Sequence, residues 1–135
     1  MILLDTDAIS HLLRPLPPAQ LAERVHAVPL RNRFLSAISV AEILYGIERT
    51  RQHEHIRMVL ETRFIARVEV LPFDLDAARV FGRIKAYLSS AGTPVAVPDL
   101  CIAATALSRD LTLVTGNESH FRRVPGLRCE NWLRQ

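Results

Sequence analysis

The sequence has few cysteines, one lysine and no long hydrophobic run, and each shortage excludes a class of protein. Only Cys101 and Cys129 are cysteines, and they stand far apart, so we expect neither a disulfide framework nor a Cys-x-x-Cys zinc site. The apolar stretch 95–107 is interrupted by Pro98 and Asp99. No stretch approaches the roughly 20 apolar residues that span a bilayer, so we expect no association with a membrane.

The sequence also lacks the marks of export and of a multidomain protein. The first residues form neither a basic leader nor a small-residue cleavage site, so a cytoplasmic location is expected. No repeat, linker or low-complexity tract divides the chain. The chain has 135 residues, and 49% of them are hydrophobic. We therefore expect residues 1–135 to form a single domain whose core needs no disulfide or structural metal.

The charge is mildly positive and is carried almost entirely by arginine. Seventeen basic residues face 14 acidic ones, for a net charge of +3, and Lys85 is the only lysine. Such a balance permits nucleic-acid binding without requiring it. Arginine suits bidentate contacts with phosphate, although a genome-wide codon bias would produce the same preference.

Short apolar runs alternate with amphipathic stretches along the whole chain, which is the pattern of βα units. The pattern predicts strands at 2–4, 34–38, 68–71, 111–115 and 127–130. It predicts helices at 6–14, at 19–27, from Ser39 to residue 50, at 53–66, after a cap at Asp74, and at 98–108. This order indicates an α/β/α sandwich with a mostly parallel central sheet.

Three acidic residues stand in unusually apolar surroundings. Asp5 follows the run 2–4, Glu42 lies within AISVAEILY, and Asp99 lies between VAVP and LCI. Each falls where an extended segment passes into a helix, so each is expected at the carboxyl edge of the sheet, where sites gather in such folds.

Helix capping offers another reading of each acid taken singly. Asp5 and Asp99 fit the N-cap positions of their helices, and Ser39 with Glu42 fits a capping box. Even so, three caps at one edge of a sheet would bring three carboxylates close together.

Clustered carboxylates need a partner, because two like charges at 4 Å repel by about 1 kcal/mol in water and by several times more near a protein surface. A retained proton or a divalent cation relieves this repulsion. A set of oxygen ligands without His or Cys suits Mg²⁺ or Mn²⁺. Thr115 and Asn117 follow a predicted strand and are candidates to orient a water or a phosphate; the alternative is an ordinary turn around Gly116.

Four stretches resemble, in order, segments of PIN-domain ribonucleases of the VapC toxin type: LDTDAIS, SVAEILYGI, PDLCIAATAL and LVTGNESHFRRVPGL. The resemblance implies a PIN-like fold and a Mg²⁺- or Mn²⁺-dependent endoribonuclease that cuts tRNA or rRNA and arrests translation. It also implies a homodimer that a cognate VapB-type antitoxin inhibits. It assigns Asp5, Glu42 and Asp99 as metal ligands and, with Asn117, as the catalytic residues.

The sequence departs from this family at one position. Many members carry a fourth acid before the phenylalanine that matches Phe121, and here His120 takes its place. A neutral histidine at this position would reduce the negative charge of the site and weaken the binding of a second metal. Other roles for His120 are contact with a phosphate or transfer of a proton, and the alternative is a surface histidine without a role in the site. Asp7 is expected to start a helix rather than to bind metal, and Arg122 and Arg123 are candidates to guide RNA.

Other readings stay open. Asp5-Thr6-Asp7 matches the opening of haloacid-dehalogenase-like phosphatases, whose first aspartate is a covalent nucleophile. That family, like the receiver domains of two-component signalling, needs a later lysine. The single candidate, Lys85, lies within a predicted amphipathic helix. The non-enzyme alternative is a PIN-like domain that only binds RNA or a protein.

Overall fold

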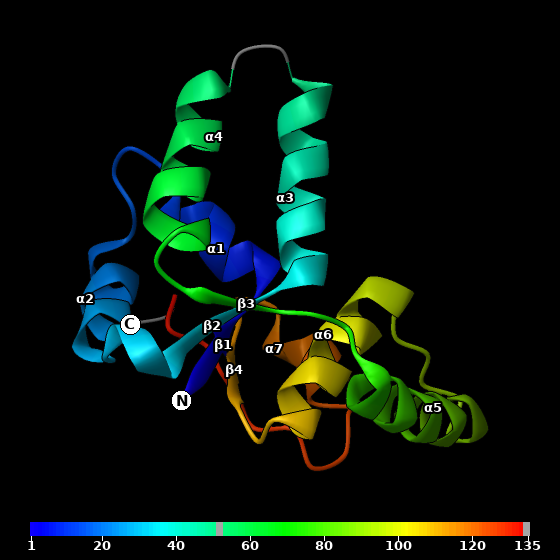
Figure 1. Ribbon diagram of the computed structural model, residues 1–135. Helices are drawn as coiled ribbons and strands as arrows, with labels where there is room; N and C mark the ends of the chain where they lie inside the picture. The colour runs from blue at the N-terminus through cyan, green and yellow to red at the C-terminus, as the bar shows by residue number, and fades with distance from the viewer. Residues whose placement is uncertain (51–52, 134–135) are drawn as a thin grey trace.

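One parallel sheet forms the centre of the computed structural model, which describes residues 1–50 and 53–133 (Figure 1). Its strands lie in the order β3-β2-β1-β4-β5, and each neighbouring pair is parallel. The strands are β1 (Ile2–Leu4), β2 (Arg33–Ser36), β3 (Glu69–Leu71), β4 (Thr112–Val114) and β5 (Cys129–Glu130). The prediction of a mostly parallel α/β sheet is confirmed.

Helices cover both faces of the sheet. Figure 1 shows α1 to α4 gathered on one side and α5 to α7 on the other. The helices are α1 (Thr6–Leu12), α2 (Ala19–Ala27), α3 (Ala37–Arg49), α4 (Glu54–Val59), α5 (Leu75–Ser90), α6 (Val97–Ser108) and α7 (Glu118–Phe121), with a 3₁₀ turn η1 (Leu30–Asn32) and a π-helical segment η2 (Leu60–Ile65). Within the described ranges, no helix is both long and apolar enough to cross a bilayer.

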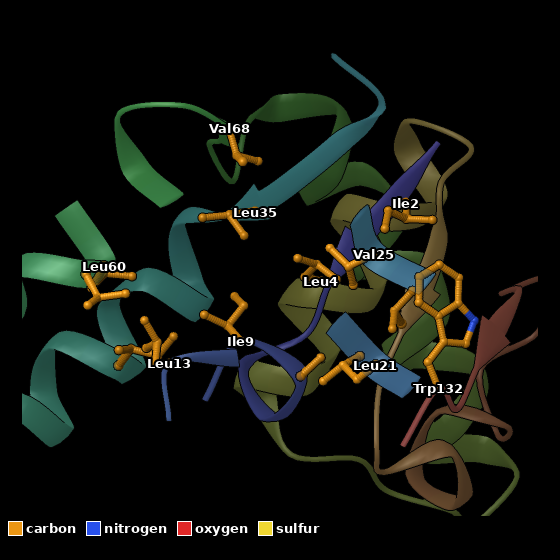
Figure 2. Packing of buried hydrophobic residues seen from close by; sticks show 14 of the residues in the cluster. Ile2, Leu4, Ile9, Leu13, Leu21, Val25, Leu35, Leu60, Val68 and Trp132 are labelled. Carbon is orange, nitrogen blue, oxygen red and sulfur yellow. The ribbon is translucent and has the colours of Figure 1, made fainter. Parts of the chain in front are cut away.

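Two hydrophobic clusters hold the layers together, one on each face of the sheet. Because side chains alternate along a strand, Ile2 and Leu4 of β1 enter one cluster and Leu3 enters the other. Figure 2 shows the first cluster, in which the sheet packs against α1, α2 and η2 and the C-terminal Trp132. The second cluster packs the sheet against α5 and α6. The alternation therefore produces the predicted α/β/α sandwich.

The start of α3 differs from the prediction. The helix begins at Ala37, and its N-cap is Ser36, whose Oγ accepts a hydrogen bond of 3.0 Å from the amide of Ser39. The predicted start at Ser39 and the capping box with Glu42 are therefore wrong. The cause is that the apolar run 34–38, predicted as a strand, continues past the end of β2 at Ser36 into the helix, and that Ser36 and Ser39 both have a side chain that can cap a helix. As a result, Glu42 lies in the second turn of α3.

Other boundaries differ by small amounts. The predicted helix 53–66 is α4 followed by η2, the helix predicted at 6–14 ends at Leu12, and α7 was not predicted. The cap at Asp74 is confirmed, since its Oδ1 accepts a hydrogen bond of 2.9 Å from the amide of Ala77. These differences do not change which strand ends form the carboxyl edge of the sheet, which is the edge predicted to carry the site.

Candidate active site

Asp5 lies at the centre of this edge, directly after β1. Its amide donates to the carbonyl of Val114 at 2.9 Å, which fixes it beside the end of β4. Although Asp5 occupies the N-cap position of α1, its side chain makes no capping hydrogen bond. The residue is 4% exposed, and its Oδ2 accepts a hydrogen bond of 2.7 Å from the hydroxyl of Thr115. Asp5 is therefore a buried carboxylate in the site rather than a helix cap.

The Thr115 hydroxyl is oriented by the next turn of the chain. The backbone amide of Asn117 donates to Thr115 Oγ1 at 2.9 Å, so the single hydroxyl proton of Thr115 is left to donate to Asp5. The side chain of Asn117 is exposed and makes no capping bond to α7. Asn117 thus supports the site through its backbone, and a catalytic role for its side chain stays a prediction.

Asp99 approaches from α6. It lies in the first turn of that helix, but the N-cap is Ala96 and no side chain caps the helix. The capping role considered for Asp99 is therefore wrong. Its partly buried Oδ2 lies 3.7 Å from Nδ1 of His120, which places His120 against one of the predicted ligands.

Asp7 also reaches this edge, from the first turn of α1. A Cβ atom at Gly116 would clash with Asp7 Oδ2 and with Leu133 Cδ1, so the absence of a side chain at Gly116 allows the carboxylate to lie against the end of β4. Nδ1 of His11 lies 3.6 Å from Asp7 Oδ1 and 2.8 Å from the Asp7 carbonyl oxygen. As predicted, Asp7 lies at the start of a helix, yet its charge also acts on Asp5.

The surroundings of Asp5 disfavour the negative charge of its carboxylate. The pKa of Asp5 is raised from 3.8 to about 6: burial is the largest cause, the hydrogen bonds from Thr115 and from the backbone of Thr6 act against it, and the charges of Asp99 and Asp7 add to it. In the part of the chain that the structure describes, no arginine or lysine forms an ion pair with Asp5, Asp99 or Glu42. A cation from solution fits this charge balance.

Glu42 is tied to the site through Thr6. The Thr6 hydroxyl oxygen lies 2.7 Å from Glu42 Oε1 and 2.9 Å from the hydroxyl oxygen of Ser39, which is buried. Because a hydroxyl has one proton, Thr6 can donate to Glu42 while Ser39 donates to Thr6. Glu42 is exposed, and this hydrogen bond holds its side chain against Thr6, the residue that follows Asp5.

The arrangement is incomplete as a metal site. Across residues 1–50 and 53–133, no three His, Cys, Asp or Glu side chains are already grouped as a set of metal ligands. Asp5 interacts electrostatically with Asp99 and Asp7, while Glu42 joins through Thr6. The donor chemistry of carboxylate oxygens suits a hard divalent cation. Joint binding of one ion by Asp5, Glu42 and Asp99 stays a prediction.

Two hydroxyl residues in this network, Thr6 and Ser39, were not among the predicted site residues. The signal that could have found Thr6 is its place directly after a buried acid at the end of a strand. No comparable signal marks Ser39, since its hydroxyl faces Thr6 only after α1 and α3 have packed together.

Comparisons with known proteins agree with this geometry. A sequence model of the PIN domain matches residues 2–127. The tRNA(fMet)-specific endonuclease VapC of Salmonella typhimurium is 41% identical over 111 residues, which are 76% of this chain and 83% of that protein. Ribonuclease VapC2 of Haemophilus influenzae is 35% identical over 131 residues, 97% of each chain. The DNA-bound VapBC structure from Salmonella typhimurium has a TM-score of 0.88 at 38% identity and covers 98% of this chain and 99% of its own.

Proposed function

Because the chain belongs to the PIN-domain family and is a VapC-type ribonuclease toxin, as its motifs predicted, we propose that it cleaves tRNA with Mg²⁺ or Mn²⁺ held by Asp5, Glu42 and Asp99. The observation that carries this proposal is the buried carboxylate of Asp5, which has two further acids near it and no arginine or lysine partner in the described residues. A divalent ion, when bound, supplies charge neutralisation and activation of a water for attack on the phosphodiester.

The residues of the chain hold the acids in place for that chemistry. The Asn117 amide, the Thr115 hydroxyl and Asp5 form one series of hydrogen bonds, and Thr6 restrains Glu42. Such fixed carboxylates need little rearrangement when RNA binds, which favours catalysis. His120 stands beside Asp99, at the position where many family members carry a fourth acid, and a histidine there adds no negative charge to the site.

The proposed substrate is a tRNA rather than rRNA. The relative from Salmonella typhimurium is by name specific for tRNA(fMet), and so is a Shigella flexneri relative that is 38% identical over 85% of this chain. We therefore propose the initiator tRNA, whose cleavage would arrest translation at its first step.

The test is to sequence RNA 5′ ends after brief induction of the wild type beside Asp5→Asn. A matched control is Asp76→Asn, which makes the same chemical change on exposed α5, where Asp76 pairs with Arg79. We expect new ends in one tRNA for the wild type and the control and none for Asp5→Asn. Ends confined to rRNA would refute the substrate, and undiminished cleavage by Asp5→Asn would refute the site. Purified wild type should lose cleavage in chelator and regain it with Mg²⁺ or Mn²⁺.

The proposed partners are a second copy of the chain and a VapB-type antitoxin. Related VapC proteins are seen in complexes named VapBC. In this chain a groove of about 360 Å³ opens between α1, α3 and α4 next to Thr6 and Glu42, with Ile43, Ile47 and Ile56 in its walls. An apolar antitoxin segment bound there would lie against the site and block access of RNA.

The alternative functions are not supported. The family match excludes the haloacid-dehalogenase-like phosphatase and the receiver domain. Lys85, the one candidate for their lysine, lies on α5 over the ring of Phe81 at 5.7 Å. Membership among ribonuclease toxins likewise argues against a PIN-like domain that only binds.

A further inference from the structure

Four arginines gather near the amino ends of β2 and β3, away from the acids. Arg31 lies in η1, Arg33 begins β2, Arg63 lies in η2, and Arg67 lies between η2 and β3. They line two hollows of about 190 and 480 Å³, and Arg33 and Arg67 belong to both. Glu69 is the only carboxylate among the described residues that line these hollows.

These four arginines have no carboxylate partner, whereas five other arginines in the described residues each form an ion pair with an acid. Arg57 pairs with Glu48, and Arg128 pairs with Asp110 at 3.0 Å. Among residues 1–50 and 53–133, no ion pair involves Arg31, Arg33, Arg63 or Arg67. Their positive charges are therefore available to an anion from solution.

Arg33 is held rigidly within this group. Its Nε donates to the carbonyl of Val28 at 2.7 Å and its Nη2 to that of His26 at 3.3 Å, so its guanidinium is fixed at the end of α2. Burial lowers the pKa of Arg33, and the nearby charge of Arg67 lowers it further. Two guanidinium groups are thus close enough to repel each other, and an anion between them would relieve the repulsion.

We propose that Arg33, Arg63 and Arg67 form a phosphate-binding site separate from the cleavage site. Guanidinium groups match the geometry of phosphate oxygens and bind them with charge-assisted hydrogen bonds. In the sheet register Arg33 is paired with Ile2, which lies three residues, or about 10 Å along the strand, before Asp5. A folded RNA is large enough to span this separation, so the bound phosphate would belong to the RNA backbone. The assignment to RNA rests on the proposed function, whereas binding of free phosphate does not depend on it.

The first experiment uses inorganic phosphate as the probe. Thermal unfolding of the wild type is compared in phosphate and in sodium chloride of equal ionic strength. At phosphate concentrations well above its dissociation constant, we expect the Tm to rise by about 4 °C over chloride. The rise should vanish in Arg63→Gln/Arg67→Gln and persist in Arg79→Gln/Arg83→Gln, a matched pair four residues apart on α5. Arg33 is left intact because it holds the end of α2.

The second experiment measures tRNA binding by fluorescence anisotropy in an Asp99→Asn background, which prevents cleavage. Arg63→Gln/Arg67→Gln should weaken binding about tenfold and reduce the slope of log K against log salt by about 1 to 2. The control pair should change affinity less than twofold. The single variant Arg67→Gln, with an intermediate loss, serves if the double variant does not fold.

The two experiments distinguish free phosphate from RNA phosphate as the ligand, and they test the phosphate site independently of the proposed ribonuclease function. Loss of the phosphate effect with unchanged tRNA affinity would identify the site as one for free phosphate. The site is refuted if neither phosphate nor tRNA distinguishes the two double variants. A wild type that shows the phosphate effect but cuts no RNA would refute the proposed function and leave the phosphate site standing.

Discussion

The substitution Asp5→Asn should make the metal-free protein more stable at neutral pH, although it removes the central acid of the site. Asparagine can still accept the hydrogen bond from Thr115, so the change removes the charge and leaves the packing in place. The difference between a pKa of 3.8 and one of about 6 corresponds to about 3 kcal/mol of destabilisation by the charged form, at 1.36 kcal/mol per pH unit. Allowing for relaxation of the site, we expect a gain of about 2 kcal/mol.

The pH dependence of this effect has a definite sign. Below about pH 3.8, Asp5 is protonated in both the folded and the unfolded chain and contributes no difference. As the pH rises toward 6, the unfolded chain loses this proton before the folded chain does, so the free energy of unfolding falls. Above pH 6 the full loss is present. The advantage of Asp5→Asn should therefore be large at pH 7.5 and shrink to about half at pH 5.

The assay is urea unfolding in chelator, followed by the fluorescence of Trp132, the only tryptophan, which is buried in the first hydrophobic cluster. Adding Mg²⁺ should reverse the order of stability, because an ion at 100 times its dissociation constant stabilises the wild type by about 2.7 kcal/mol and should bind Asp5→Asn weakly. A variant that is less stable than the wild type at pH 7.5 in chelator would refute the view that Asp5 is an uncompensated charge.

Three further substitutions test the surroundings of Asp5. Asp99→Asn should abolish RNA cleavage while its circular dichroism spectrum stays native, and its unfolding midpoint in chelator should be unchanged or higher, since no side-chain cap is lost. Thr115→Val removes a buried hydrogen bond to a carboxylate and should lower the free energy of unfolding at pH 7.5 by about 2 kcal/mol, with loss of cleavage. Gly116→Ala places a methyl group against Asp7 and should cost about 1–2 kcal/mol in urea unfolding, with a smaller loss in the Asp7→Ala background.

The positions of the acids were predictable because each depends on a local pattern. Asp5 follows three apolar residues that are buried as β1, and parallel strands place their carboxyl ends at one edge. The same logic located Asp99 near the start of α6. Local patterns thus fixed which backbone segments would meet.

The hydrogen bonds that hold these acids were not predictable from local patterns. Thr115 and Asp5 are 110 positions apart, and their contact depends on β1 pairing with β4, a choice made by packing of the whole sheet. The misplaced start of α3 has a similar cause. Ser36 and Ser39 can both cap a helix, and Ser36 is the cap because β2 ends there, where it is paired with Leu71 of β3.

The acids of the candidate site lie at the carboxyl ends of the strands, whereas the arginines of the proposed phosphate site lie near the amino ends of β2 and β3. The chain has 17 basic residues, yet within the described ranges no arginine or lysine forms an ion pair with Asp5, Asp7, Glu42 or Asp99. An arginine beside Asp5 would neutralise it permanently and compete with a divalent ion. The arginines near the amino ends of β2 and β3 have no such competitor, so added salt should weaken tRNA binding steeply there. Binding of a divalent ion by buried Asp5 should depend less on salt, because buried charges are screened less.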